Sequence, residues 1–151
     1  MKRREFITLF GGAAAWPVVA RAQQAMSVIG FFHFDSPAAG PRIAAFRKGL
    51  RDAGYVEGKN VIIDFRTATN ADQFQQVANQ LVAAKVDLIV ASGSEAVSAA
   101  KRATQTIPIV MTTTSDPLGT GFVKSLARPG GNITGLSMLN PELAGKRLAG
   151  C

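Results

Sequence analysis

The sequence predicts an α/β fold, a doubly wound parallel sheet with the strand order 2-1-3-4-5. Short apolar runs alternate along the chain with segments of helical periodicity, which is the pattern of repeated strand–helix–strand units. Residues 86–90 and 107–111 are apolar at most positions, as in parallel strands that are covered on both faces. Right-handed crossovers join such units into one sheet, for which 2-1-3-4-5 is a common order.

Composition favours one folded domain. The chain has 151 residues, of which 47% are hydrophobic and 18% are charged, so it can bury a core. The formal net charge is +7, but residues 1–22 alone carry four basic residues and one acidic residue. The remaining basic residues are spread out and accompany no nucleic-acid-binding motif, so we expect no nucleic-acid partner. Cys151 is the single cysteine, which excludes an intrachain disulfide.

Residues 1–22 have the features of an export signal. Basic residues at positions 2–4 precede an apolar segment over 7–20, and Ala-Arg-Ala at 20–22 provides small residues around a cleavage site. The letters RREFI at 3–7 resemble a twin-arginine signal, and an ordinary Sec-type signal is the alternative. We expect export to a bacterial periplasm, with membrane contact only through this segment before cleavage.

The first half of the mature chain contains two strand–helix units. Strands are expected over 28–32 and 61–65, and Asp64 suggests that the second strand is the more exposed. A helix over 41–53 buries one face and ends at Gly54. Asn70 is the expected N-cap of the next helix, whose apolar stripe is Phe74, Val77, Ala78, Leu81 and Val82.

The second half repeats the pattern around the strands at 86–90 and 107–111. Ser92 is expected to cap the helix between these strands, with Glu95 reaching back in a capping box. Beyond the second of them, the sequence predicts a short helix over 118–126, a fifth strand over 133–136 and a last helix over 141–149.

Hydroxyl side chains follow several of these strands. Ligands of open α/β sheets bind beyond the carboxyl ends of the strands, where helix N-termini also provide N–H groups. The sequence therefore predicts a site for a small carboxylate, held by neutral donors. Helix capping is the alternative role of the same residues. The hydroxyl residues at this edge are Ser36, Ser92, Ser94, Thr112, Thr113, Thr114 and Ser115.

Enzyme, metal and cofactor chemistry have little support. His33 and Asp35 could orient a serine nucleophile, but the Gly-x-Ser-x-Gly turn is absent. No metal-ligand spacing and no dinucleotide or P-loop glycine motif occurs. We therefore expect no catalytic residue, no metal and no cofactor. The alternative is an exported flavodoxin-like cofactor-binding protein or enzyme that uses residues 112–115 as an anion loop.

The chain resembles the substrate-binding proteins of ABC transporters. It is more closely similar to exported type I periplasmic binding proteins, a family that includes binders of tryptophan and other aromatic amino acids. RPGGNITG and GYVEGKNV are the most specific segments. The resemblance is carried by RREFITLFGGAAAWPVVARAQQ, VIGFF, AAFRKGLRDAGYVEGKNVIIDFR, VDLIVASGSEAVSAAKRAT, IPIVMTTTSDPLGTGFVKSLARPGGNITGLS and ELAGKRL.

This resemblance implies two α/β lobes that close on a small organic solute, and an ABC permease as partner. Family members are about twice as long, so residues 23–151 are expected to be the N-terminal lobe of a truncated protein. Hydroxyl and N–H groups would bind an amino-acid-like carboxylate, and Asp116 would either take the ammonium or cap its own turn. The loops that face the cleft would contain Asp35, Ser36, Ser92, Gly93, Ser94, Thr113, Thr114, Ser115 and Asp116.

Overall fold

The computed structural model of the chain describes residues 26–138. Within them, strands and helices alternate up to the fourth strand, and a long irregular segment then leads to the fifth. The predicted export signal and the predicted last helix lie outside the described residues. The elements are β1 (Ser27–Phe34), α1 (Ala39–Asp52), β2 (Val61–Ala68), α2 (Ala71–Ala83), β3 (Leu88–Ser92), α3 (Ser94–Ala103), β4 (Ile109–Thr114) and β5 (Ile133–Ser137).

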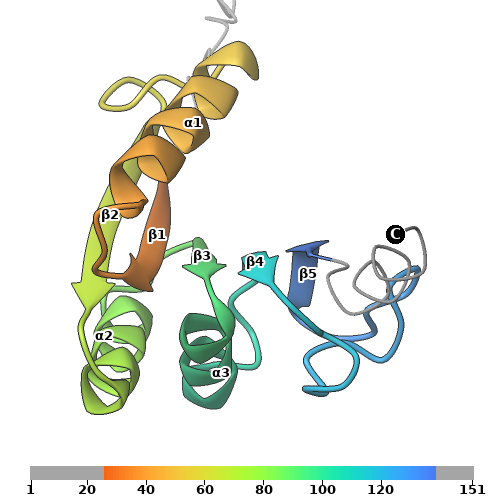
Figure 1. Cartoon of the computed structure of the whole chain (residues 1–151). Helices are drawn as coiled ribbons and strands as arrows, with labels where there is room; N and C mark the ends of the chain where they lie inside the picture. Colours follow the sequence, from red (N-terminus) through yellow and green to blue (C-terminus); the bar gives the residue numbers. More distant parts are fainter. Residues whose placement is uncertain (1–25, 139–151) are drawn as a thin grey trace, which may run out of the picture.

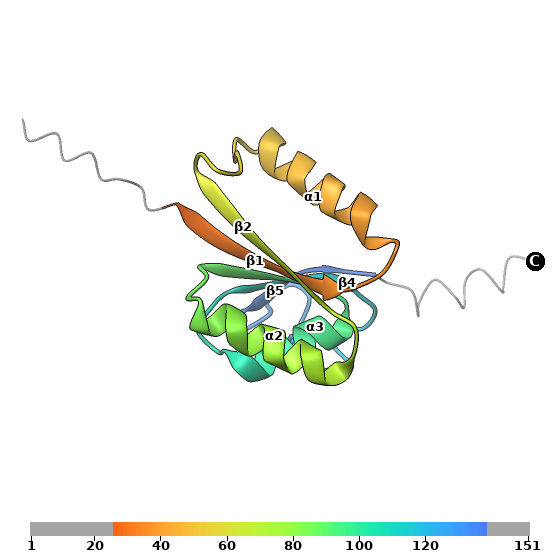
Figure 2. The same cartoon turned by 90° about the vertical axis from the view of Figure 1, so that its left-hand side faces the viewer.

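The five strands form one parallel sheet with the order β2-β1-β3-β4-β5, which confirms the predicted topology. Helix α1 lies on one face of the sheet, whereas α2 and α3 lie side by side on the other (Figures 1 and 2). Strand β2 is at an edge, and Asp64 in it is half-buried, as its charge suggested. No helix in the described residues is long and apolar enough to cross a membrane.

The core has two parts, one on each face of the sheet. Beneath α2 and α3, strand residues such as Phe32 and Ile89 pack with Leu81 of α2, and all three are fully buried. Gly30 makes room for this contact, since a Cβ there would lie 2.7 Å from a methyl carbon of Leu81. On the α1 face, Phe31 packs against Phe46, with ring centroids 4.8 Å apart.

A β-bulge interrupts the pairing of β4 with β5. The register shifts between Met111 and Thr114, and Thr113 has a positive φ of 57°. Such a φ is rare for a β-branched residue and indicates local strain. Opposite the bulge, Gly135 has a φ of 135°, and a Cβ there would lie 2.1 Å from the Met111 carbonyl oxygen. Glycine is therefore required at position 135.

Two local predictions were wrong. Residues 118–126 form turns rather than a helix, because Asp116 caps a tight turn by accepting from the Gly119 N–H (2.8 Å) and Gly121 has a φ of 68°. The Ser92–Glu95 capping box is absent, since Gly93, with a φ of 96°, is the N-cap of α3. The Asn70 cap of α2 is confirmed by a 3.0 Å bond from the Gln73 N–H.

Candidate functional site

Two hydroxyls meet where β3 and β4 end. The Ser92 and Thr113 Oγ atoms lie 3.2 Å apart, although 21 positions separate the residues. Thr113 reaches Ser92 because its left-handed backbone interrupts the regular alternation of β4. Ser92 is only 7% exposed, whereas Thr113 is half-buried, so the pair lies at the border between core and solvent. Each hydroxyl retains capacity for a further hydrogen bond.

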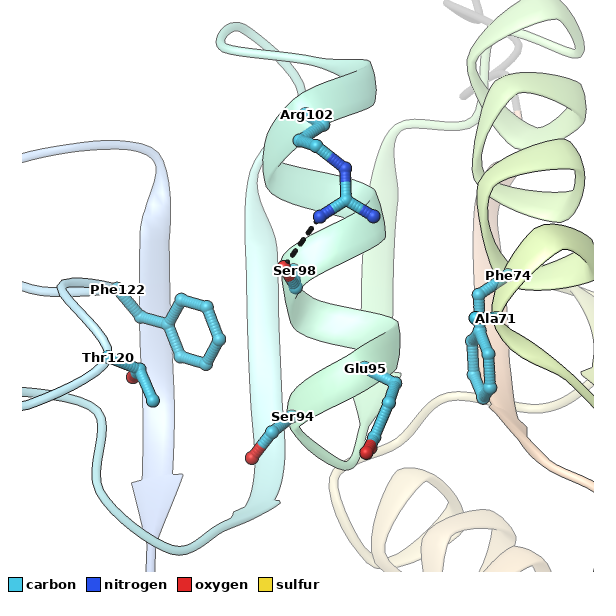
Figure 3. Close-up of a pocket in the computed structure, with 8 residues that line it drawn as sticks. All are labelled: Ala71, Phe74, Ser94, Glu95, Ser98, Arg102, Thr120 and Phe122. Carbon is cyan, nitrogen blue, oxygen red and sulfur yellow. Dashed lines mark hydrogen bonds between the residues drawn. The ribbon is translucent and has the colours of Figure 1, made fainter.

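The start of α3 continues this edge. The Gly93 N–H donates to the Thr112 carbonyl (3.0 Å), which fixes the turn from strand to helix. Ser94 and Glu95 follow in the first turn and line an open groove of about 470 Å³ that runs along the outer face of α3. Figure 3 shows the walls of this groove, with Phe74 on one side of α3 and Phe122 on the other. The lining residues are Ala71, Phe74, Ser94, Glu95, Ser98, Arg102, Thr120 and Phe122.

The loop after β1 is held by its backbone. The Asp35 N–H donates to the Ala68 carbonyl (3.0 Å), and the Ser36 carbonyl accepts from the Ala39 N–H (2.9 Å). The Asp35 side chain is exposed and the Ser36 side chain half-buried. Neither side chain has a hydrogen bond within the described part of the chain. Both are therefore free to contact a ligand.

The residues after Thr113 divide into different environments. Thr114 is fully buried, and its Oγ1 has no hydrogen-bond partner in the described residues. Ser115 is exposed. Asp116 is also exposed, and its Oδ1 is 2.8 Å from the Gly119 N–H. Of the two roles that the sequence left open for Asp116, the structure thus contains the turn cap.

Two residues beside Ser92 were not among the expected ligand-binding residues, and one of them, His33, was considered only as a partner of Asp35 in catalysis. A second, small hollow of about 10 Å³ lies between the start of α1 and the ends of β1 and β3, and its lining includes His33, Arg42 and Ser92. His33 is 6% exposed, and its Nδ1 is 2.8 Å from the Phe34 carbonyl oxygen. His33 and Ser92 are partners in the β1–β3 register, so strand alternation could have placed them on one face.

No group of three His, Cys, Asp or Glu residues that could hold a metal occurs in residues 26–138. The hydrogen bonds that Arg66 donates to the Asp64 carboxylate raise the pKa of Arg66, in spite of partial desolvation. This ion pair lies on β2 and lines neither hollow. The chemistry at the edge of the sheet is therefore that of hydroxyls, N–H groups, one histidine, one free arginine and the carboxylates of Asp35, Glu95 and Asp116.

Comparison with known proteins gives matches in sequence and in structure. Residues 28–149 match the family model described as ABC transporter substrate binding protein. A curated relative from Clostridioides difficile, named "Tyrosine-binding protein", is 46% identical over 93 residues, which are 61% of this chain and 27% of that protein.

Three solved structures have the same fold. A conserved domain protein from Vibrio cholerae is 36% identical, with a TM-score of 0.75; the match covers 82% of this chain and 43% of the Vibrio protein. A ligand-free, open substrate-binding protein with adhesive properties from Clostridium difficile is 33% identical with a TM-score of 0.71, covering 81% and 43%. A domain from Streptococcus pneumonia in complex with L-Trp is 34% identical with a TM-score of 0.70, covering 74% and 38%.

The chain thus spans less than half the length of these relatives. The family model nevertheless covers most of the chain. The sheet of the chain has the strand order of one lobe of a periplasmic binding protein. The chain therefore belongs to the family of ABC transporter substrate-binding proteins.

Proposed function

We propose that this chain is the N-terminal lobe of the solute-binding component of an ABC importer, and that it binds an aromatic α-amino acid without catalysing a reaction. Its family supports the transport role. The ligand class is supported by the relatives, one of which is named for tyrosine and another of which was solved with L-Trp. An ABC permease is the expected protein partner.

The observation that carries this proposal is the Ser92–Thr113 hydroxyl pair. It lies at the carboxyl ends of β3 and β4, the edge of an open α/β sheet at which ligands bind. Hydroxyls can donate to a carboxylate without burying an unpaired charge in the free protein. The start of α3 follows immediately and adds the partial positive charge of a helix N-terminus.

An aromatic surface at the same edge fits the side chain of the ligand. Phe34, the last residue of β1, is 51% exposed. Its ring stacks on Phe74 with centroids 6.2 Å apart and an interplanar angle of 15°. Since Phe74 is buried, it fixes the orientation of the exposed ring. Offset stacking on Phe34 would favour an aromatic ligand over an aliphatic one of similar size.

A titration followed by ¹H–¹⁵N NMR tests the proposal, because the method detects the weak binding expected of one lobe. L-Trp and L-Tyr should shift the amide signals of Ser92, Gly93 and Thr113. Ser92→Ala should weaken binding about three- to tenfold, the value of one hydrogen bond. Ser27→Ala is the matched control, since Ser27 is exposed at the opposite end of β1. Absence of shifts with either amino acid would refute the ligand class.

We further propose that residues 1–22 are a twin-arginine export signal and that residues 23–151 act in the periplasm. The basic start, apolar segment and Ala-Arg-Ala sequence support an export signal. Cell fractionation should recover the processed chain from the periplasm. Replacing Arg3 and Arg4 with lysine should retain it in the cytoplasm, and unchanged export would indicate a Sec-type signal.

A further inference from the structure

We propose that two residues lining the small hollow beside Ser92 recognise the two charged groups of the amino acid. His33 Nε2 accepts a hydrogen bond from the ammonium inside the hollow, and the exposed Arg42 binds the carboxylate at its mouth. This inference rests on the proposed function and adds a charged subsite to the hydroxyl pair. It also revises the expectation that neutral donors alone hold the carboxylate.

The hollow lies at the sheet edge that the proposed function requires. It is bounded by the first turns of α1 and by the last residues of β1 and β3. Its volume of about 10 Å³ accommodates roughly one water-sized atom, here the ammonium nitrogen, so the carboxylate lies outside the hollow beside Arg42. Ser92 lines the hollow and also contacts Thr113, so one ligand can contact both groups.

The hydrogen bond of His33 determines what its free nitrogen can bind. The Phe34 carbonyl oxygen can only accept, so the Nδ1 that lies 2.8 Å from it must carry the proton. In the neutral ring, Nε2 then presents a lone pair and binds a donor. Nε2 has no partner in the described residues, although His33 is more than nine-tenths buried. An edge contact with Phe31 (ring centroids 5.7 Å apart) orients the ring.

An ammonium donor is the best match for this nitrogen. Nε2 is accessible to solvent, because Thr114 Oγ1 is the one fully buried side-chain polar atom without a partner in the described residues, so a ligand N–H can replace water at this nitrogen. Two carboxylates at this edge are less well placed: one Asp116 oxygen accepts the Gly119 N–H of its own turn, and Asp35, although it has no partner in the described residues, does not line the hollow. His33 therefore provides an acceptor that no contact within the described chain uses.

Arg42 provides the complementary charge. It is exposed and has no ion pair or hydrogen bond within the described residues, whereas Arg47 pairs with Glu57. The first turn of α1 contains no acidic residue that would compete for the guanidinium. A guanidinium forms two parallel hydrogen bonds with a carboxylate, which makes it a specific partner. The start of α1 also favours an anion at this position.

Ligands that lack one charged group test each role separately. The probes are L-tryptophan, tryptamine, which has no carboxylate, and indole-3-propionate, which has no ammonium. Arg42→Gln should weaken L-tryptophan binding about tenfold and leave tryptamine binding unchanged. Arg51→Gln removes the same charge from the other end of α1 and should change neither. Binding is followed by NMR titration of the whole chain, and unperturbed remote amide signals verify the fold.

The His33 variants follow the same logic. His33→Leu should weaken L-tryptophan binding several-fold and leave indole-3-propionate unchanged. His33→Gln should keep most of the L-tryptophan affinity, because its side-chain oxygen can accept near the position of Nε2. If His33→Leu does not fold, His33→Gln is compared with His33→Glu, which replaces a neutral acceptor with a charged one. Tighter binding of tryptamine by the glutamate variant supports the role of His33. Equal binding of tryptamine by the two variants overturns it.

The failures of this inference and of the proposed function have different signatures. If L-tryptophan shifts the amide signals of Ser92 and Thr113 equally in the wild type, Arg42→Gln and His33→Leu, the charged subsite is refuted and the proposed function stands. Arg42→Gln that weakens all three ligands alike overturns the carboxylate role of Arg42. A wild-type chain that binds no amino acid overturns both.

Discussion

Replacing Gly135 with alanine should destabilise the fold by about 2–4 kcal/mol. The substitution introduces a Cβ on β5 at a backbone φ of 135°, which is essentially restricted to glycine and costs other residues about 1–3 kcal/mol. That Cβ would also lie 2.1 Å from the oxygen and 2.7 Å from the nitrogen of Met111. Neither backbone atom can rotate away, so β5 must separate from β4 at the bulge.

Urea unfolding followed by far-UV circular dichroism measures this loss. A domain of this size has a total stability of about 5–15 kcal/mol. With an m value of about 2 kcal/mol per molar, the unfolding midpoint should fall by about 1–2 M. Gly131→Ala is the matched control, because a Cβ at position 131 meets nothing within 4 Å. The control should change stability by less than about 1 kcal/mol.

Equal midpoints for the two variants would refute the reasoning. That result would mean that β5 accepts a side chain at position 135 and that the bulge is not fixed by a close backbone approach. Because the bulge also gives Thr113 its conformation, Gly135→Ala should move the Thr113 amide signal in the NMR spectrum, and Gly131→Ala should not.

Two other substitutions test the folded core and its caps. Leu81→Ala should lower the free energy of unfolding by about 2–5 kcal/mol, since the side chain is fully buried against Gly30. A loss below about 1 kcal/mol, measured by urea unfolding, would contradict this packing. Asn70→Ala should lower the free energy of unfolding by about 1 kcal/mol, because it removes the acceptor of the Gln73 N–H, whereas Asn79→Ala within the same helix should lower it clearly less. Equal melting temperatures of the two variants in thermal unfolding would contradict the role of the cap.

The strand order could be predicted because local patterns agree with the fold. The apolar strands at the centre of the sheet contrast with the edge strand β2, whose Asp64 suggested a more exposed position. Asn70 and Gln73 gave the start of α2 to the residue, since the capping bond is local. The length and order of such units leave few parallel topologies.

Other features depend on contacts that a local pattern does not contain. Leu118 and neighbouring apolar residues suggested a helix, but the glycines at 119 and 121 and the Asp116 cap favour turns. Ser92 was expected to cap α3, yet its hydroxyl contacts Thr113 from another strand. That contact depends on the bulge, and the sequence contains no separate signal for a bulge at this position.

The candidate site was predicted in part for the same reason. Strand ends and hydroxyl residues are visible in the sequence, so the edge of the sheet could be identified. The approach of Arg42 to His33 and Ser92 depends on where α1 packs, which is a tertiary property. The helix expected over 41–53 contains four basic residues, and nothing in the sequence distinguishes Arg42 from the other three.

The position of β1 constrains how this chain can fold during synthesis. Of the described strands it is the first to leave the ribosome, yet it lies between β2 and β3, and Ile29 pairs with Leu88. At translation rates of about 5–20 residues per second, the nascent β1 waits roughly 3–12 seconds for its second partner. A strand with the apolar run Val28 to Phe32 is prone to aggregate during that interval, so we expect the yield of native protein to depend on chaperones that shield it.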